Sequence, residues 1–385
     1  MANYTIHEVR GLWSLFKFIK FQNDLYKDCP QYVPSIYVDQ IQTLTKNPAL
    51  DYCIHKMWVV KDGKKIVGRI CAMINPRYNE RYGTRRARFG WFDTIEDFEV
   101  ARLLIETAEK WAMEQGMNEI HGPLFFNTLG KQGMLVEGFE NVPPFNCLYN
   151  YPYYSDFIER LGYAKECDWV QYRIDLVTEP PERITRIADR LQERYGFIDG
   201  DVDNLKKDKA LVKKFFQLYS DSFAEAVYNF IPFTEKEMEE EAKGAVPMLD
   251  SRISCFLLDK DKEIAAFGIC FASMSKYLQK ANGSILRFAL NMRKMKKDVS
   301  VIDLMINGAA PKWQNTGISS VFHARLQKTC RAANVQYAIT NPQIESNKAV
   351  NVWASYDNTQ LFMRRRCYLH RLSNFVEPEN VVKED

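Results

Sequence analysis

The stretch APKWQNTGISSVFHARLQKTC, residues 310–330, contains a turn that is followed directly by a helical pattern. Gln314, Gly317 and Ser319 lie in or beside the turn, and the first two turns of the helix contain no acidic residue. The first N–H groups of a helix are unpaired and lie at the positive end of its dipole, so they bind phosphate oxygens well. The stretch therefore predicts an anion-binding helix start. The alternative is that Thr316 is an ordinary N-cap and Gly317 an ordinary turn glycine.

Composition limits the classes of protein that the chain can represent. A length of 385 residues favours two domains, and 46% hydrophobic with 26% charged residues is typical of a globular protein. The net charge of only +3 does not indicate a nucleic-acid binder. No apolar run is long enough for a membrane span, and the N-terminus lacks a signal-peptide core. The nine cysteines form no C-x-x-C pair, so we expect a reducing cytoplasm and no metal site.

The order of predicted elements repeats once along the chain. The first half reads as a helix, a hairpin, a strand, a helix, a strand, a short helix and a strand, over residues 12–27, 53–74, 86–93, 95–115, 118–126, 155–161 and 164–176. The second half reads as two helices, a hairpin and then strand, helix, strand, helix and strand, over residues 208–223, 235–243, 253–274, 299–308, 317–333, 335–341, 346–356 and 364–372. A Glu-Pro-Pro-Glu sequence interrupts the pattern at the join. We therefore predict two domains, residues 1–178 and 179–385.

This element order resembles the GNAT acyltransferase superfamily. Its acyl-CoA motif, Gln/Arg-x-x-Gly-x-Gly/Ala, lies between the fourth strand and the next helix, and residues 314–319 (QNTGIS) match it with a final serine. The resemblance implies an α/β fold of two tandem GNAT-like domains, each a mixed central sheet flanked by helices. It also implies acyl-CoA or acetyl-CoA as the acyl donor, with acyl carrier protein as an alternative. The expected cofactor contacts are Asn307, Gln314, Asn315, Thr316, Gly317, Ile318, Ser319 and Asn347.

The corresponding stretch of the first half has a different helix start. FDTIEDFEVARLL, residues 92–104, lacks glycine and places Glu96, Asp97 and Glu99 where a phosphate would bind. These carboxylates would repel the ligand. We therefore expect a degenerate first domain and one acyl-CoA site, in the second half.

Two residues are candidates for acid–base chemistry. Asp303 lies on the strand before the cofactor turn, at the spacing of the carboxylate base in several GNAT members, and its apolar neighbours would raise its pKa. Alternation would put Asp303 and Asn307 on one face of the strand. The alternative is an aspartate paired with an arginine near a sheet edge. The tyrosine that usually acts as the acid is replaced by Trp353, and Tyr356 is the nearest substitute. His323 is expected to be a packing residue.

Residues 121–154 are rich in glycine, proline and aromatic residues and are predicted to form an ordered loop that closes a cleft between the domains. Phe125, Asn127, Tyr149, Tyr153 and Tyr154 are the expected substrate contacts. With PKWQNTGI and ESNK-x-VNVW, this stretch resembles the branch of tandem GNAT proteins that contains bacterial ceramide synthases, which transfer a fatty acyl group to a sphingoid amine. The resemblance implies a long-chain amine as the acceptor.

The segment from residue 264 to 297 contains one acid-free basic amphipathic stretch. It has seven basic residues, and Ile285, Phe288, Met292 and Met295 recur at helical spacing. Three interpretations remain open: a helix on an anionic membrane surface, a cover over an acyl-chain groove, or a solvated helix packed on its domain. The first would make the protein peripheral at the inner face of the membrane.

The sequence supports an acyl-CoA-dependent N-acyltransferase that acts on a small-molecule or lipid amine. A non-catalytic acyl-CoA- or lipid-binding protein is the first alternative, because the usual tyrosine is missing. A peptide ligase that uses aminoacyl-tRNA is the second, although the chain shows no heptad run for the coiled-coil arm typical of such enzymes. No nucleic-acid partner is expected, and the sequence does not predict an oligomeric state.

Overall fold

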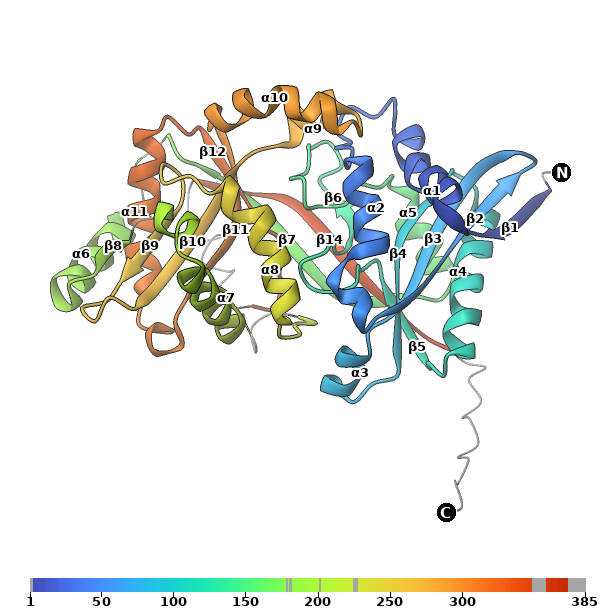
Figure 1. Cartoon of the computed structure of the whole chain (residues 1–385), viewed down its shortest axis with the longest axis horizontal. Helices are drawn as coiled ribbons and strands as arrows, with labels where there is room; N and C mark the ends of the chain where they lie inside the picture. Colours follow the sequence, from blue (N-terminus) through green and yellow to red (C-terminus); the bar gives the residue numbers. More distant parts are fainter. Residues whose placement is uncertain are drawn as a thin grey trace, which may run out of the picture.

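Figure 1 shows the computed structural model of the chain, which describes residues 3–177, 179, 182–200, 202–223, 228–347 and 358–372. The described strands are β1 (Tyr4–Glu8), β2 (Ile54–Asp62), β3 (Lys65–Ile74), β4 (Arg86–Thr94), β5 (Glu119–Gly122), β6 (Met134–Glu137), β7 (Ala164–Asp175), β8 (Ile198–Gly200), β9 (Cys255–Leu258), β10 (Ile264–Ala272), β11 (Val301–Ala309), β12 (Tyr337–Thr340), β13 (Gln343–Ile344) and β14 (Thr359–Arg371). The described α-helices are α1 (Gly11–Leu25), α2 (Tyr37–Lys46), α3 (Pro76–Tyr82), α4 (Phe98–Glu114), α5 (Tyr153–Arg160), α6 (Glu182–Tyr195), α7 (Lys209–Phe223), α8 (Glu235–Ala245), α9 (Ser275–Ala281), α10 (Ile285–Lys297) and α11 (Ile318–Ala332). Together they form one mixed sheet with helices packed against it, as predicted.

The order of elements repeats between the two halves, which confirms the predicted repeat. Two helices, α1 and α2, precede the β2–β3–β4 meander of the first half, and α7 and α8 precede β9–β10–β11 in the second. A helix then leads to a parallel strand in each half: α4 to β5, and α11 to β12. The helix predicted over residues 346–356 lies almost entirely outside the described residues.

The two halves exchange their closing strands. The sheet runs β1-β2-β3-β4-β5-β14-β7-β12-β11-β10-β9-β8. Strand β7, from the first half, therefore pairs with β12 of the second half, and β14, from the end of the chain, pairs with β5 of the first half. Strands β7 and β14 pair with each other along most of their lengths and so join the first-half and second-half parts of the sheet (Figure 1). The expected boundary after residue 178 follows soon after β7, and whether either segment folds alone stays a prediction.

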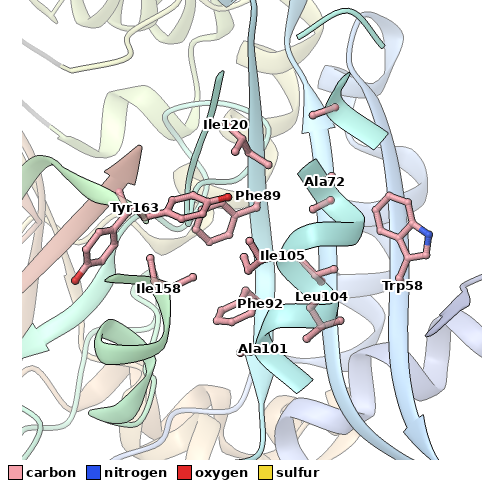
Figure 2. Close-up of a cluster of buried hydrophobic side chains, with 14 of the residues drawn as sticks. Trp58, Ala72, Phe89, Phe92, Ala101, Leu104, Ile105, Ile120, Ile158 and Tyr163 are labelled. Carbon is pink, nitrogen blue, oxygen red and sulfur yellow. The ribbon is translucent and has the colours of Figure 1, made fainter. Parts of the chain in front are cut away.

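Each half packs one long helix closely on its sheet, and a glycine permits the contact. In the first half, α4 lies over β3 and β4, and its Ala101, Leu104 and Ile105 form a core with Phe89 (Figure 2). A Cβ atom at Gly68 would lie only 2.7 Å from the side chain of Val100 on α4. In the second half, a Cβ at Gly268 would lie 1.9 Å from the ring of Phe322 on α11. These close approaches account for a glycine inside two buried strands.

The opposite face of the second half carries a separate apolar core. It contains phenylalanines of β10 and α7, among them Phe215, Phe216, Phe267 and Phe271. Helices α8 and α10 cover this core, and Met295 of α10 is fully buried in it. The second-half sheet thus lies between two apolar layers, one on the face that packs against α11 and one on the face that packs against α7.

The strand exchange predicts that the N-terminal and C-terminal segments remain associated after the chain is cut between them. A protease site inserted after residue 179 should yield two fragments that remain together on size-exclusion chromatography, because each sheet contains a strand of the other fragment. As a control, a chain that ends at residue 358, and so lacks β14, should lose thermal stability in both halves. Separation of the cut fragments under native conditions would contradict the exchange.

Candidate functional site

The turn before α11 has the features of an anion-binding helix start. Gly317 is the N-cap of α11 and has φ +89°, a left-handed conformation that favours glycine. No side chain caps the helix, and its first turn contains no acidic residue. Gln314, Asn315, Thr316 and Ser319 are exposed around the turn. The first N–H groups of α11 therefore face solvent at the positive end of the helix dipole, where an anion can bind.

Two contacts hold this turn in place. The ring of Trp313 packs edge-on between Tyr195 and Phe197, with centroid distances of 5.1 and 4.9 Å. The Thr316 hydroxyl donates a hydrogen bond to the Trp313 carbonyl at 2.6 Å. Thr316 is therefore not the N-cap, and the alternative of an ordinary threonine cap is wrong. The side chain of Ile318 is buried in the core, so only its backbone is available to a ligand.

Strands β11 and β12 separate within β11, before the chain reaches this turn. They pair in parallel from Val301 to Leu304, and the Asn341 N–H adds a last bond to the Leu304 carbonyl at 2.9 Å. Strand β11 continues to Ala309, but the described residues provide it no strand partner on that side after Leu304. This part of β11 therefore presents backbone N–H and C=O groups to a ligand that enters between the two strands.

A β-bulge changes the faces of β11 beyond the point of separation. Ile269 pairs with Ile306 and Cys270 with Leu304, so Met305 has no partner on β10. Asp303 consequently shares a face with Phe271, whereas Asn307 lies beside Gly268, on the α11 face. The expectation that Asp303 and Asn307 share one face is wrong, because the extra residue of the bulge shifts the alternation by one.

Asp303 is a carboxylate buried in the second half. Its exposed fraction is 1%, and neither carboxylate oxygen forms a hydrogen bond within the described part of the chain. Burial raises the pKa of Asp303 to about 7, against a small opposing effect of the nearby Ser273 side chain that falls short of hydrogen-bond geometry. Strand β11 is internal to the sheet, and Asp303 forms no ion pair with a described arginine. The alternative of an edge aspartate paired with arginine is therefore wrong.

An apolar cavity of about 380 Å³ opens on the same face of the sheet. Its floor includes Phe271 of β10, the strand partner of Asp303, and the bulge residues Met305 and Ile306. Phe215 and Phe216 of α7 form one wall. Asp303, whose pKa lies near neutrality, therefore projects from the same face of the sheet beside the floor residue Phe271, at the level where β11 and β12 separate, but it does not itself line the cavity.

Polar groups occupy two sides of this cavity. Asn146, from the first half, donates a hydrogen bond to the Asn341 side chain at 2.7 Å, just past the end of β12. Glu241 of α8 also lines the cavity; its side chain is exposed to solvent, but the protein packed around it, together with Glu237 and Glu240, raises the pKa of Glu241 to about 7. Sequence reasoning missed Glu241. The only available signal was its place in the acidic helix.

The first-half loop reaches the cavity, but with residues other than the expected ones. Thr128–Gln132 and Phe145–Asn146 line the cavity wall, as an ordered loop between the halves would. Asn127 donates a hydrogen bond to Glu237 of α8 at 2.8 Å and so bridges the halves. Phe125 stacks on Trp91, with ring centroids 3.6 Å apart, in the core of the first half.

The three expected tyrosines also lie within the first half. The hydroxyl groups of Tyr153 and Tyr154 donate to the Thr94 carbonyl, at 2.7 and 3.1 Å, and that of Tyr149 donates to the Phe139 carbonyl at 3.2 Å. None of these tyrosines lines the cavity behind α7. Their assignment as substrate contacts, like that of Phe125 and Asn127, stays a prediction.

The corresponding positions of the first half are closed. Asp97 caps α4 through a hydrogen bond from the Glu99 N–H at 2.9 Å, so a carboxylate already occupies the helix start. The space beyond the parallel β4–β5 pairing is filled by the stacked rings of Trp91 and Phe125. The Leu124 N–H also donates to the Phe89 carbonyl at 2.8 Å, so the chain after β5 stays beside β4 where β11 and β12 separate in the second half.

Of three further candidate residues, His323 and Asn347 lie in the described part of the chain and Tyr356 does not. His323 is buried against Phe322, and burial lowers its pKa to about 4, which fits a packing residue. Asn347 follows β13, with its backbone N–H bonded to the Ile344 carbonyl at 3.0 Å. Tyr356 and Trp353 lie outside the described residues, so the assignment of the acid stays a prediction.

One cluster offers metal-ligating atoms. His121 of β5, Glu166 of β7 and Cys367 of β14 bring their ligand atoms within 4.8 Å of one another. The second oxygen of Glu166 contacts the Arg86 guanidinium at 2.6 Å. Burial alone would raise the pKa of Glu166, but His121 and the Arg86 charge hold it below its usual range. The cluster is accounted for as a buried ion pair with hydrogen bonds.

None of the described helices is both long and apolar enough to cross a membrane.

Comparison with known proteins identifies the fold. No family model matches the chain. Its structure resembles a tandem GNAT protein from the clavulanic acid biosynthesis pathway, with a TM-score of 0.56 and 10% identity, covering 96% of this chain and 99% of the other. It also resembles a GCN5-related N-acetyltransferase from Sphaerobacter thermophilus, with a TM-score of 0.53 and 8% identity over 97% and 98% of the two chains. The predicted tandem GNAT fold is thereby confirmed.

Two curated proteins are similar in sequence over nearly their whole length. Protein YghO of Escherichia coli is 28% identical over 365 residues, which cover 91% of each chain. The bacterial ceramide synthase of Caulobacter vibrioides is 25% identical over 365 residues, covering 91% of this chain and 92% of that protein. The second similarity agrees with the branch that the sequence motifs resemble.

The helix start yields a direct test of ligand binding. Gly317→Glu should abolish CoA binding, because it places bulk and negative charge at the start of α11. Gly116→Glu is a matched control, since Gly116 also has a positive φ, +77°, but lies at the end of α4 in the first half. Titration calorimetry should show loss of CoA binding in the first variant and unchanged affinity in the second. Normal CoA affinity in a folded Gly317→Glu protein would exclude this turn as the site.

Proposed function

We propose that the protein is an N-acyltransferase that moves an acyl group from acyl-CoA to a primary amine with a long alkyl chain. The observation that carries the proposal is that Asp303 is buried, lacks a hydrogen-bond partner among the described residues and shares a sheet face with the apolar cavity, at the point where β11 separates from β12. The tandem GNAT fold and the similarity to a bacterial ceramide synthase support it. Such an enzyme would work at the inner face of the cytoplasmic membrane.

The acyl donor would bind along the second half only. The N-terminus of α11 would bind its diphosphate, with Gln314, Asn315, Thr316 and Ser319 around it. The unpaired backbone groups of β11 beyond Leu304 would hold the rest of the donor by hydrogen bonds. Asn307 lies on the α11 face of that strand and is suitably placed for the same ligand. An acyl carrier protein would present an equivalent thioester arm.

Asp303 would act as the general base. A long-chain amine arrives as an ammonium ion, and it must lose a proton before its nitrogen can attack the thioester carbon. A carboxylate whose pKa is about 7 accepts that proton well near neutral pH. As the amide bond forms, the nitrogen loses its second proton to solvent and the carbon–sulfur bond breaks, and the leaving thiolate takes one proton from solvent or from an acid on the chain. Backbone N–H groups of β11 would stabilise the oxyanion.

The cavity walls support an apolar acceptor. Aromatic and aliphatic side chains of α7, β10 and β11 dominate them, and among the described residues that line the cavity Glu241 is the one with an acidic side chain. A polyamine would require several acidic partners to replace its hydration. An alkyl chain gains about 0.8 kcal/mol for each buried CH₂ group. Glu241 would then serve as the single counter-charge for the ammonium group of a long-chain amine.

The burial of Asp303 argues against a protein that only binds acyl-CoA. An unpaired carboxylate in the core destabilises the folded state, and a binding protein has no use for it. An enzyme that must remove a proton from an ammonium group, by contrast, needs a carboxylate whose pKa is raised by burial. Consumption of acyl-CoA with release of free thiol, measured in the presence and absence of long-chain amines, separates the two functions.

Asp303→Asn should slow turnover by about 10²–10⁴-fold while leaving CoA affinity unchanged, because it removes the base but keeps the shape of the side chain. In the parent protein, kcat/KM should fall as the pH drops below about 7, where Asp303 becomes protonated. Asp261→Asn, which removes an exposed carboxylate in the β9–β10 turn, is the control. Parent-like activity and pH dependence in the Asp303 variant would refute the assignment.

Gly244→Phe tests the role of the cavity. Gly244 of α8 lines the cavity, and a Cβ atom there would meet no other atom within 4 Å, so the new ring can enter the cavity without distorting the helix. We expect roughly tenfold or greater loss of activity toward amines with long chains and little change toward short ones. Gly244→Ala should behave like the parent protein. Equal loss for all chain lengths would show that the cavity does not hold the amine chain.

A further inference from the structure

Helix α10 has two apolar faces, and only one of them is buried. Met295 is fully buried, and Phe288 and Met292 pack against the same core that forms the cavity wall. The opposite face carries Leu286 and Leu290, with exposed fractions of 74% and 85%. Two large aliphatic side chains one helical turn apart and fully in solvent are not required by the fold.

Basic residues surround this outer face. Arg287, Arg293, Lys294 and Lys297 are exposed and form no ion pair within the described part of the chain. The sequence contains no acidic residue from position 264 to 297. Leucines with unpaired cations at their edges are the pattern of a helix that lies in the interface of an anionic bilayer.

A second exposed apolar group lies nearby, at the start of α1. Leu12 and Trp13 have exposed fractions of 72% and 70%, and the Lys17 ammonium lies 5.2 Å from the centroid of the Trp13 ring. The two helices come from different halves of the chain and lie in the same upper part of Figure 1.

A chain of contacts connects the two apolar groups. The ring of Trp13 stacks on Phe16, and Phe16 contacts Tyr37 edge-on, with centroid distances of 6.0 and 5.5 Å. The Tyr37 N–H then donates to the carbonyl of Gly283, two residues before α10 begins, at 2.9 Å. The first turn of α1 is therefore connected, through Phe16 and the start of α2, to the residue pair that precedes α10.

We propose that the outer face of α10 and the first turn of α1 form one docking surface for an anionic lipid bilayer. The leucines and the tryptophan would insert among the acyl chains, and the basic residues would pair with anionic headgroups. A second copy of the chain fits this surface less well, because two such faces would bring like charges together. The inference rests on the proposed function for its purpose, since α10 would bring the apolar core that lines the cavity, and on which its inner face packs, close to a lipid substrate.

The test measures binding to vesicles made of phosphatidylcholine and phosphatidylglycerol, and to vesicles of phosphatidylcholine alone. The parent protein should co-sediment with the anionic vesicles and much less with the neutral ones. Leu286→Gln combined with Leu290→Gln should weaken binding to anionic vesicles by at least about tenfold. Arg293→Gln with Lys294→Gln should weaken it by about tenfold or more at low salt and less at high salt.

Matched controls remove equivalent groups elsewhere. Val177→Gln replaces another exposed apolar residue, and Lys64→Gln with Lys260→Gln removes two exposed charges from hairpin turns. These variants should bind vesicles like the parent protein. Parent-like vesicle binding by the double leucine variant would overturn the proposal. So would a loss of self-association, seen by light scattering, in place of a loss of vesicle binding.

The activity of the same variants separates this proposal from the proposed function. With detergent-solubilised amine, the double leucine variant should match the parent protein, and only activity on vesicle-borne amine should fall. Leucine-dependent vesicle binding by a chain that acylates no amine would uphold the docking surface and refute the proposed function. Acylation of vesicle-borne amine that is unaffected by the leucine substitutions would uphold the proposed function and refute the docking surface.

Discussion

The pairing of β7 with β14 fixes where the two halves of the chain meet. Its centre is held by Arg365, which is completely buried and donates to the Gln171 side chain at 3.1 Å and to the Leu148 carbonyl. Gln171 in turn donates to the Thr340 carbonyl at 3.0 Å, at the end of β12. A buried guanidinium is tolerated only when hydrogen bonds replace its water. These bonds tie the central strands of the molecule to the point where β12 ends and the opening beside β11 begins.

That opening explains why Asp303 can remain unpaired. A buried carboxylate normally acquires a cation or several hydrogen bonds, and within the described chain Asp303 has neither. The charge of Asp303 acts on the thiols of Cys147 and Cys270, whose pKa values are raised by burial and, to a smaller extent, by this carboxylate. Cys147 belongs to the first half, so the carboxylate lies close to the junction. Burial in the surrounding core brings the pKa of Asp303 to about 7, so the carboxyl group can gain or lose a proton near neutral pH.

Much of the fold follows from local patterns. Hydrophobic alternation located the β2–β3 and β9–β10 hairpins, and the 3.6-residue period located α4, α7 and α11 to within a few residues. The strand exchange does not follow from local patterns, because β7 and β14 read as ordinary closing strands whose partners lie far away in sequence. Helix α6, directly after the predicted domain join, was not predicted. Most of its residues are charged or polar, so the apolar pattern that includes the buried Ile184 and Ala188 is weak.

The candidate site was predictable to a similar extent. Gly317 and its acid-free helix are contiguous in sequence, so their roles could be read together. The sequence does not reveal which faces of β11 carry Asp303 and Asn307. A bulge at Met305 breaks the alternation, and the residue types around it do not indicate a bulge. Glu241 reaches the cavity only because α8 packs against the second-half core, which is a tertiary contact.

The two halves have diverged by the way in which each fills the space beside its parallel strands. In the first half, Trp91 and Phe125 stack in the space beyond the β4–β5 pairing, and Asp97 caps the helix. The loop that begins with Phe125 then continues through Thr128–Gln132 to the cavity of the second half. Aromatic packing thus anchors one end of the loop while its next residues form the cavity wall. A closed first site is therefore what allows the first half to contribute to the second: a rigid core on which the wall of the open site is built.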